Sequence, residues 1–476
     1  MTAILFLFVK QVKGPLMEKK LASNKILWMF AIGQLGWAAL AGVISNCLVY
    51  YYMPEDSLLS QGHTIFIAQS AVFFGMLTII GGITALGRLF DAVTDPWIAS
   101  LSDRCKHRLG RRIPFLRYAA IPFGVVTVLV FVSPIPGESP INAVFLAVMM
   151  LLFYLCMTCY CTPYNALIPE LGRTQKLRIN VSTYISATYF IGTALAYTVP
   201  TIASMLFPTF GVAGGYRIAI AGLAVVAVIC MLVPAFGIDE HKYADTTPSE
   251  SPAFNSLVKT FKNKEFQTFV ASDILYWVAF TMFQTGLLFY VTELMGLDVA
   301  WSTILLVLMM VVAFILYIPV NFLAKRIGKK KLIVFAFSFF AVTFGITALS
   351  GMLGVPLEAW GILIAVLASI PLAILGVLPQ AVVADIADVD ALDTGEARQG
   401  MFYAARTFAM KLGQAVSMLV FTGIIAMDIG DMKYRITAIV ACAFCLLGAL
   451  VFARYHEKVV LARIEEENRD LLAEEA

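Results

Sequence analysis

GRLFDAVTDPWIASLSDRCKHRLGRR, residues 87–112, is an apolar segment that contains charged residues and ends in a basic turn. Arg88, Asp91 and Asp95 are spaced i, i+3 and i+7, so all three share one face of a helix. Asp91 lies 12 residues before Asp103, a distance of about 18 Å along a helix axis. Charges at that depth in a membrane are costly and usually face a cavity. The stretch therefore predicts a membrane helix with a functional polar face.

The composition of the 476-residue chain supports a membrane setting. Hydrophobic residues make up 60% and charged residues 14%, against about 45–50% and about 25% in soluble domains. A soluble surface could not hide so many apolar side chains. A mean hydropathy of +0.85 also excludes a disordered chain and a disulfide-stapled module. The net charge of +3 is too small to indicate nucleic-acid binding, so a polytopic membrane protein remains.

Twelve stretches are long enough to span a membrane, which takes roughly 20 apolar residues, and they form two sets of six. The predicted spans are 26–51, 72–100, 115–132, 141–167, 181–207, 217–236, 266–291, 301–323, 332–353, 360–383, 401–426 and 436–454. We predict an all-α membrane protein with 12 transmembrane helices in two six-helix bundles. Its parts are a cytoplasmic tail (1–24), an N-terminal bundle (25–237), a cytoplasmic connector (238–265), a C-terminal bundle (266–457) and a cytoplasmic tail (458–476).

The basic residues give the expected orientation. With an even number of spans, both termini share one side with the even-to-odd loops, and 28 of the 34 Lys and Arg residues fall there. The opposite side has only Arg217, Lys433 and Arg435. Because cytoplasmic loops are rich in basic residues, we expect a cell (inner) membrane protein with both termini in the cytoplasm. We also hypothesise that translation begins at Met17, since MEKKLASNK is a more conventional cytoplasmic start.

Similar basic turns follow the second span and the eighth span, at the same place in each half. The first combines Asp103 with Gly110, Arg111 and Arg112, and the second reads KRIGKK at 325–330. Weak similarity between halves is expected when two helix bundles rock around a central site. Together with the two sets of six spans and the long connector, this pattern resembles the major facilitator fold.

Lys411, in the eleventh span, supplies a positive charge at the depth of the carboxylates. It lies 13 residues past Arg398, which is about 20 Å along a helix. An isolated lysine there is disfavoured, so we expect a carboxylate partner such as Asp91. Either a static ion pair holds the two halves together, or the pair exchanges partners as a cation and a substrate bind. Carboxylate oxygens suit Na⁺, Li⁺ or H⁺ rather than a soft transition metal.

Three stretches resemble the glycoside–pentoside–hexuronide:cation symporters, a family of melibiose permease-like transporters within the major facilitator superfamily. They are residues 87–112, TPYNALIPEL at 162–171 and ADIADVDALDTGEARQGMFYAARTFAMKLGQA at 384–415. The resemblance covers the whole transporter domain.

The family resemblance implies roles for residues of three spans. The implied cation ligands are Asp91, Asp95, Thr94 and Thr158. Thr94 stands where a family member has an asparagine, which leaves the choice between Na⁺ and H⁺ open. Lys411 falls on the family lysine that links cation binding to substrate binding, and we place Arg88 in the same coupling group.

The positions that grip a sugar in the family are different in this chain. Its charged residues align with the uncharged Ala38, Ser186 and Cys161. Amide and aromatic side chains could substitute, since amides bind hydroxyl groups and rings stack on sugars; helix packing is the alternative role for each. We predict substrate contacts at Gln34, Trp37, Asn165, Tyr184, Trp277 and Gln380, with Asn46, Tyr276 and Gln284 as further candidates.

An acidic cluster before the eleventh span lies opposite the basic loops of the first half. We hypothesise a cytoplasmic gate that is closed in the outward-facing state and broken in the inward-facing one. Its predicted members are Asp103, Arg111, Arg112, Asp385, Asp388 and Arg398. The alternative is ordinary solvated loop charge.

The combined pattern predicts a secondary active symporter that couples Na⁺ or H⁺ entry to uptake of a glycoside or another sugar. A cation-coupled transporter of an amphipathic substrate such as a lysophospholipid is the first alternative, and a non-transporting membrane sensor is a distant one. We expect no enzymatic activity, because the sequence contains no nucleophile–base constellation and no metal cluster. The expected partners are a small-molecule substrate, a coupling cation and the lipid bilayer, with no cofactor, no nucleic acid and a monomeric state.

Overall fold

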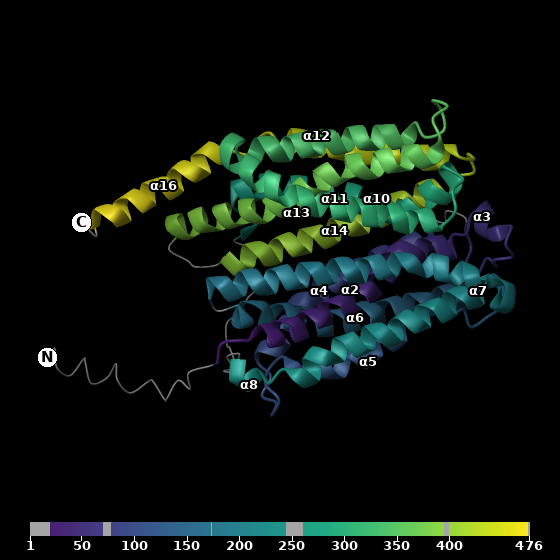
Figure 1. The fold of residues 1–476 in the computed structure, drawn as a ribbon, viewed down its shortest axis with the longest axis horizontal. Helices are drawn as coiled ribbons and strands as arrows, with labels where there is room; N and C mark the ends of the chain where they lie inside the picture. The colour runs from purple at the N-terminus through teal and green to yellow at the C-terminus, as the bar shows by residue number, and fades with distance from the viewer. Residues whose placement is uncertain (1–19, 70–77, 173, 244–259, 395–398, 475–476) are drawn as a thin grey trace.

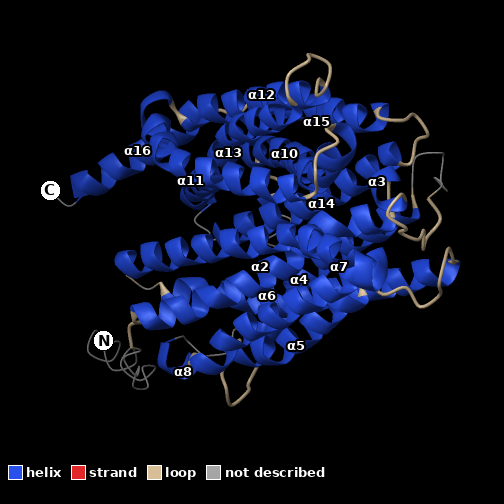
Figure 2. Ribbon diagram, turned by 45° about the vertical axis from the view of Figure 1, so that its right-hand side comes forward, coloured by secondary structure: helices blue, strands red, loops and turns tan. Residues whose placement is uncertain are grey.

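The computed structural model describes residues 20–69, 78–172, 174–243, 260–394 and 399–474. These residues form helices joined by short loops and contain no strand (Figure 2). The all-α fold predicted from the sequence is therefore confirmed. The hypothesis that translation begins at Met17 concerns residues outside this described part.

The N-terminal half supplies six spans from five helices. They are α2 (Asn24–Tyr52), α4 (Ile79–Asp103), α5 (Ile113–Leu129), α6 (Pro140–Leu171) and α7 (Gln175–Gly237). The 63-residue α7 reverses at Gly211, whose φ of 70° lies in the left-handed region that glycine tolerates. Beyond that turn, a Cβ on Gly215 would lie 2.7 Å from the carbonyl oxygen of Ala203. The two arms of α7 thus pack closely as the fifth and sixth spans.

The C-terminal half contains the other six spans. They are α10 (Lys264–Phe289), continued by the π-helix η1 (Tyr290–Leu294), α11 (Ala300–Ile327), α12 (Lys329–Ala348), α13 (Leu357–Thr394), α14 (Gln399–Ile425) and α15 (Met432–Phe452). Among the described residues, nine helices are long and apolar enough to cross a membrane. Counting both arms of α7 and adding the charged α4 and the shorter α5 gives the predicted twelve.

Most predicted spans differ from the observed helices by a few residues at one or both ends, and two of them need comment. The second span was predicted to begin at residue 72, whereas the described part of α4 begins at Ile79 and residues 70–77 lie outside the description. The tenth span was predicted to end at residue 383, but α13 continues to Thr394. Ile386, Ala387 and Asp390 form the buried side of this extension. Small and apolar residues recur at helical spacing in this acidic segment, residues 384–394. The segment therefore forms a helix rather than a loop.

The twelve spans form two bundles that lie side by side (Figure 1). The start of α2 and the end of α15 lie on the same side of the molecule, which we call the terminal side, and the other is the distal side. Across the interface, α4 packs against α14, α2 against α10, and α7 against α11. Among the described residues, three helices lie outside the bundles: α3 (Asp56–Leu59), α8 (Glu240–Tyr243) and α16 (Glu457–Glu474).

Glu240, just after the sixth span, binds the turn between α4 and α5. Its carboxylate is fully buried and accepts hydrogen bonds from the backbone N–H groups of Arg111 (3.0 Å), Arg112 (2.8 Å) and Ile113 (2.9 Å). A negative charge is stabilising at a helix N-terminus. Gly110 has a φ of 107°, and a Cβ there would lie 2.3 Å from Oε2 of Glu240. This glycine is therefore required both by its conformation and by the space around it.

Glu457 repeats this arrangement just after the twelfth span. Its carboxylate accepts hydrogen bonds from the backbone N–H groups of Lys329 (2.6 Å) and Lys330 (3.2 Å) at the start of α12. Gly328 precedes them with a φ of 91°, and a Cβ there would lie 2.8 Å from Oε2 of Glu457. The internal repeat predicted from the basic turns thus includes an acidic cap at the end of each half.

Candidate functional site

Asp91 lies at the centre of α4, 12 residues from each end, and its side chain is buried. Thr158 of α6 donates a hydrogen bond to its Oδ1 at 2.6 Å. The ammonium group of Lys411, from α14 of the other bundle, lies 2.8 Å from its Oδ2. That oxygen accepts no hydrogen bond of good geometry. Asp91 is therefore held in place but retains an oxygen that a cation could bind.

Asp95 lies one helical turn nearer the terminal side and also contacts Lys411. Thr162 of α6 donates a hydrogen bond to its Oδ1 at 3.0 Å. The two threonines of α6 are four residues apart, like the two aspartates, so each carboxylate has its own hydroxyl donor. The Asp95 side chain is 27% exposed, whereas that of Asp91 is 1% exposed. Asp95 is thus the more accessible of the two carboxylates.

Thr94 completes the predicted set of cation ligands. Its hydroxyl donates to the backbone carbonyl of Asp91 at 3.2 Å and lies 3.5 Å from the hydroxyl of Thr158. The four predicted ligands therefore lie together between α4 and α6. Thr162 is an additional oxygen donor that the sequence reasoning did not assign, although it stands in the quoted TPYNALIPEL stretch.

The balance of charge in this cluster favours binding of one monovalent cation. Asp91 and Asp95 contribute two negative charges and Lys411 contributes one positive charge. The three side chains together therefore carry a net charge of −1. Its carboxylate and hydroxyl oxygens are hard ligands, which fit Na⁺ or a proton. Like charges this close are stable only with a cation or proton between them.

Arg88 lies one turn beyond Asp91 toward the distal side of α4. Its guanidinium lies 5.3 Å from the ring centroid of Tyr154. Its described hydrogen bond is a long one, 3.4 Å, to the hydroxyl of Ser45 on α2. The predicted coupling residues Arg88 and Lys411 thus reach the same site from opposite bundles.

The predicted substrate contacts do not form one cluster of touching side chains in the described structure. Gln34 is buried and accepts a hydrogen bond from the indole of Trp37 at 3.2 Å. Tyr184 stacks on Trp28, with ring centroids 4.3 Å apart. The other three are Asn165 and Gln380, which are exposed, and Trp277, which is partly buried. Their role in substrate binding stays a prediction.

The first-half residues of the predicted cytoplasmic gate pair within their own bundle. Glu170, at the end of α6, accepts a hydrogen bond from Arg112 and lies 3.5 Å from Arg111. Asp103 lies 3.6 Å from the guanidinium of Arg112. Glu170 was not among the predicted gate residues, although it lies in the quoted 162–171 stretch.

The second-half gate residue Asp385 also has a described contact within its own bundle. Asp385, on the extension of α13, accepts a hydrogen bond from the ammonium group of Lys329. Asp388 lies one turn further along the same helix and has an interaction partner of its own. Arg398 lies outside the described residues. The gate between the bundles stays a prediction.

On the distal side, polar groups join the two bundles. Lys433 of α15 lies 2.6 Å from Glu55, which follows α2. The hydroxyl of Tyr50 donates to Thr292 at 3.3 Å, and Ser57 donates to Glu293. We call these residues the distal gate. The sequence reasoning did not identify it, although Lys433 was noted as one of three basic residues on that side.

Asp273 and Arg406 form a second buried ion pair, within the C-terminal bundle. Two parallel hydrogen bonds of 3.0 and 3.1 Å join the guanidinium of Arg406 on α14 to the carboxylate of Asp273 on α10. The side chains are 11% and 3% exposed. This pair was not identified from the sequence. The sequence signal for the pair is Asp273, which lies in the seventh span at a depth similar to that of Arg406 in the eleventh.

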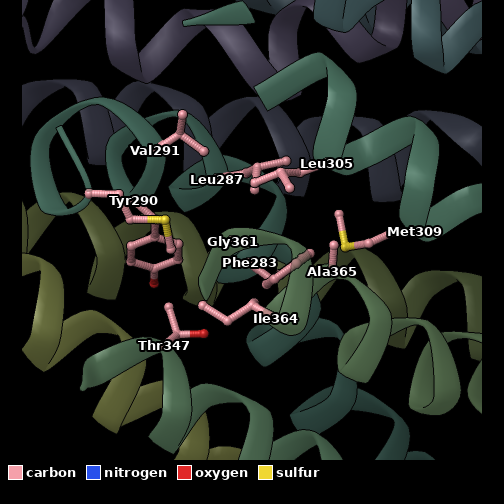
Figure 3. Close-up of a pocket in the computed structure, with 11 residues that line it drawn as sticks. Phe283, Leu287, Tyr290, Val291, Leu305, Met309, Thr347, Gly361, Ile364 and Ala365 are labelled. Carbon is pink, nitrogen blue, oxygen red and sulfur yellow. The ribbon is translucent and has the colours of Figure 1, made fainter. Parts of the chain in front are cut away.

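A separate apolar pocket lies inside the C-terminal bundle near the distal end of α10 (Figure 3). It is lined by side chains such as Phe283, Leu287, Leu305 and Met309, and Thr347 is a polar group at its edge. None of the predicted cation, substrate or gate residues lines it. The charged cluster between the bundles is therefore the candidate site.

Comparison with known proteins places this geometry in a family. The profile described as MFS/sugar transport protein matches residues 29–457, which include both bundles and the whole charged cluster. The chain belongs to this family. The predicted major facilitator fold and the predicted kinship with sugar:cation symporters are thus confirmed at the level of the family, and the chain is a multi-pass membrane transporter.

Individual relatives of this MFS transporter are distant but match it over most of their length. "Sodium-dependent lysophosphatidylcholine symporter 1" of Xenopus tropicalis is 24% identical over 468 residues, covering 85% of each chain. A protein of Escherichia coli (strain K12), provisionally named a sulfoquinovose importer, is 25% identical over 437 residues, covering 84% of this chain and 89% of the relative. A proton dependent oligopeptide transporter shares the fold with a TM-score of 0.65 at 12% identity, covering 93% and 100% of the two chains.

Proposed function

We propose that this protein is a secondary active symporter in which entry of Na⁺ or H⁺ drives uptake of a sugar or glycoside by alternating access. The observation that carries the proposal is the position of Lys411. Its ammonium group comes from one bundle and contacts both Asp91 and Asp95 of the other. A cation that binds these carboxylates must compete with the ion pair that joins the bundles. Cation binding and bundle movement are therefore linked.

The order of events follows from exposure and charge. A cation arriving at the more exposed Asp95 displaces Lys411 and then reaches the buried Asp91. The hydroxyl groups of Thr158 and Thr94 supply neutral oxygen ligands. Lys411 then loses its anionic partners, so its contact no longer holds the bundles in one arrangement. Coupling requires that the bundles switch only when cation and substrate are both bound or both absent.

Substrate binding is assigned to the uncharged groups around the cluster. The description of the family as sugar transport and the relative provisionally named a sulfoquinovose importer both favour a sugar. Gln34 and Trp37 are the best-supported pair, because they already contact each other on the helix that faces α10. An amide beside an indole offers hydrogen bonds to hydroxyl groups and a flat face to a sugar ring.

A lysophospholipid is the second candidate substrate. Its support is the relative named "Sodium-dependent lysophosphatidylcholine symporter 1", which matches 85% of this chain. The uncharged residues at positions that grip sugar in the symporter family, Ala38 and Cys161, also suit a less polar substrate.

Uptake into proteoliposomes tests the proposal and separates its two substrates. Purified protein is given a sugar panel and a lysophospholipid, with a Na⁺ gradient, a pH gradient or neither. Accumulation of a sugar that requires one of the gradients supports the first substrate. Gradient-driven uptake of the lysophospholipid alone selects the second. Equal equilibration with and without gradients contradicts symport itself.

We further propose that the terminal side faces the cytoplasm in the cell (inner) membrane and that the protein acts as a monomer. The excess of basic residues on this side supports the orientation. Labelling with a membrane-impermeant thiol reagent in intact cells tests it. A single cysteine in α16 should be protected and one in α3 should be modified, and the reverse result overturns the orientation.

A further inference from the structure

Arg88 is a fourth charge beside the cation cluster, and it lies at the interface of the bundles. The Ser45 hydroxyl that it contacts belongs to α2. The backbone carbonyl of the same Ser45 accepts a hydrogen bond from Thr285 of α10, at 3.4 Å. The guanidinium is thus placed where the two bundles meet, on the distal side of Asp91.

Arg88 lacks the partners that a guanidinium in a membrane normally has. Within the described structure, no carboxylate oxygen lies within 4.0 Å of it, and its buried Nε has no hydrogen-bond partner. Arg406, by contrast, has both sides of its fork bound by Asp273. The planar fork of arginine matches carboxylate, sulfonate and phosphate groups. An unpaired guanidinium between the bundles therefore points to an anion that arrives from outside the chain.

The charges of the site lead to the same conclusion. One bound cation together with Lys411 balances the two charges of Asp91 and Asp95, which leaves the positive charge of Arg88 without a counter-ion. A single bound cation makes the loaded site positive by one charge, and net charge inside a membrane is costly. A substrate with one negative charge restores neutrality, whereas a neutral sugar leaves the excess charge in place.

We propose that the transported substrate carries one negatively charged group, a carboxylate, sulfonate or phosphate, and that Arg88 binds it. This inference rests on the proposed symport and narrows its substrate class. Ser45 and the Tyr154 ring orient the guanidinium. Transport of one cation with one such anion moves no net charge.

The test compares matched substrates in proteoliposomes with an imposed membrane potential. The probes are a neutral glucoside, the corresponding glucuronide and lysophosphatidylglycerol, which has the same single negative charge on a lipid. We expect gradient-driven uptake of an anionic probe that is insensitive to the potential. A complex carrying one net charge would be biased about 50-fold by 100 mV. Uptake of the glucuronide identifies a sugar acid as the transported anion. Uptake of lysophosphatidylglycerol identifies a phospholipid instead.

Two variants separate recognition by Arg88 from a structural role. Arg88→Gln should raise the KM for the anionic probe at least 10-fold, and Arg88→Lys should restore part of the loss. Stabilisation of the purified protein by Na⁺ or by protons should persist in both variants, because Asp91 and Asp95 are intact. An unchanged KM in Arg88→Gln overturns the inference.

The outcomes also separate this inference from the proposed function. Gradient-driven, potential-sensitive accumulation of the neutral glucoside, without uptake of either anion, overturns the anionic substrate and leaves symport standing. Absence of gradient-driven uptake for all three probes contradicts symport and the inference together.

Discussion

Within the described membrane-spanning helices, the buried pair Asp273–Arg406 and the buried cluster Asp91–Asp95–Lys411 differ in composition and in location. Asp273 and Arg406 form a closed pair with two parallel hydrogen bonds, and both residues belong to the C-terminal bundle. Asp91, Asp95 and Lys411 form an unequal group of two acids and one base, shared between the bundles. The first cluster is complete by itself, whereas the second can accept one more positive charge.

This difference distinguishes buried charges that stabilise one bundle from buried charges that take part in ion coupling. A matched pair within one rigid bundle gains nothing from rearrangement, because any movement exposes both charges without a partner. An unmatched cluster at a moving interface changes its contacts whenever an ion binds. The number of charges and the bundles they come from thus predict which cluster couples ion binding to motion.

The largest expected effect comes from neutralising one carboxylate of the shared cluster. Asp91→Asn should reduce gradient-driven accumulation at least 100-fold, because the buried anionic ligand is lost. Lys411 keeps Asp95 as a partner, so the protein should still fold. Uptake in proteoliposomes and the yield of monodisperse protein measure the two effects. Normal accumulation in this variant would remove Asp91 from the coupling site.

The same change in the closed pair should affect stability instead. Asp273→Asn leaves Arg406 buried without its anion, which destabilises the protein by about 3–5 kcal/mol. Adding Arg406→Gln should recover most of that loss, because no uncompensated charge remains. Thermal unfolding in detergent measures both variants. If the double variant is no more stable than Asp273→Asn, the pair does not act as a unit.

The distal gate offers an intermediate case, because its ion pair between Glu55 and Lys433 joins the two bundles. Burial raises the pKa of Glu55 above its ordinary range, despite the opposing effect of Lys433. Opening the gate returns Glu55 to water, so the closed form binds a proton more tightly than the open form. Stabilisation of the closed form by this proton is therefore present at low pH and is lost as the pH rises through the raised pKa.

Accessibility measurements test this pH dependence. A single cysteine on the distal side should become several-fold more reactive toward a water-soluble thiol reagent as the pH rises through that range. The analogous change should be absent in Glu55→Gln, after correction for the intrinsic reactivity of the thiol. An identical profile in both proteins would show that Glu55 does not control the gate.

The smallest effect is expected at the two acidic caps, which are matched between the halves. Glu240→Gln and Glu457→Gln each remove a negative charge from a helix N-terminus and should each destabilise the protein by about 1 kcal/mol. Thermal unfolding of the two variants should give similar shifts. A large loss for one cap alone would show that the halves do not use this repeated feature equally.

Much of the fold could be predicted from the sequence because the membrane restricts the possible structures. Apolar length predicts the spans, and the charge spacing in 87–112 places Asp91 and Asp95 on one helical face. The pairing with Lys411 could be anticipated from equal depth. Thr158 and Thr94 came from family resemblance, and the structure places both at the cluster.

The remaining features depend on contacts between distant segments. Glu240 caps the N-terminus of α5 although it follows α7, 127 residues later in the chain. Glu55 contacts Lys433, which is 378 residues away in the chain. Neither carboxylate stands out from neighbouring surface charges in the sequence. The α13 extension was also missed, because its aspartates suggest a loop while its Ala and Ile residues continue a helical face.

Accumulation by two matched double variants tests most directly whether the cluster shared between the bundles couples ion binding to transport. Asp95→Asn with Lys411→Gln, and Asp273→Asn with Arg406→Gln, each remove one acid and one base from a buried cluster. We expect the first double variant to abolish gradient-driven accumulation and the second to retain most of it. Normal accumulation by the first variant would contradict the assignment of coupling to the cluster shared between the bundles.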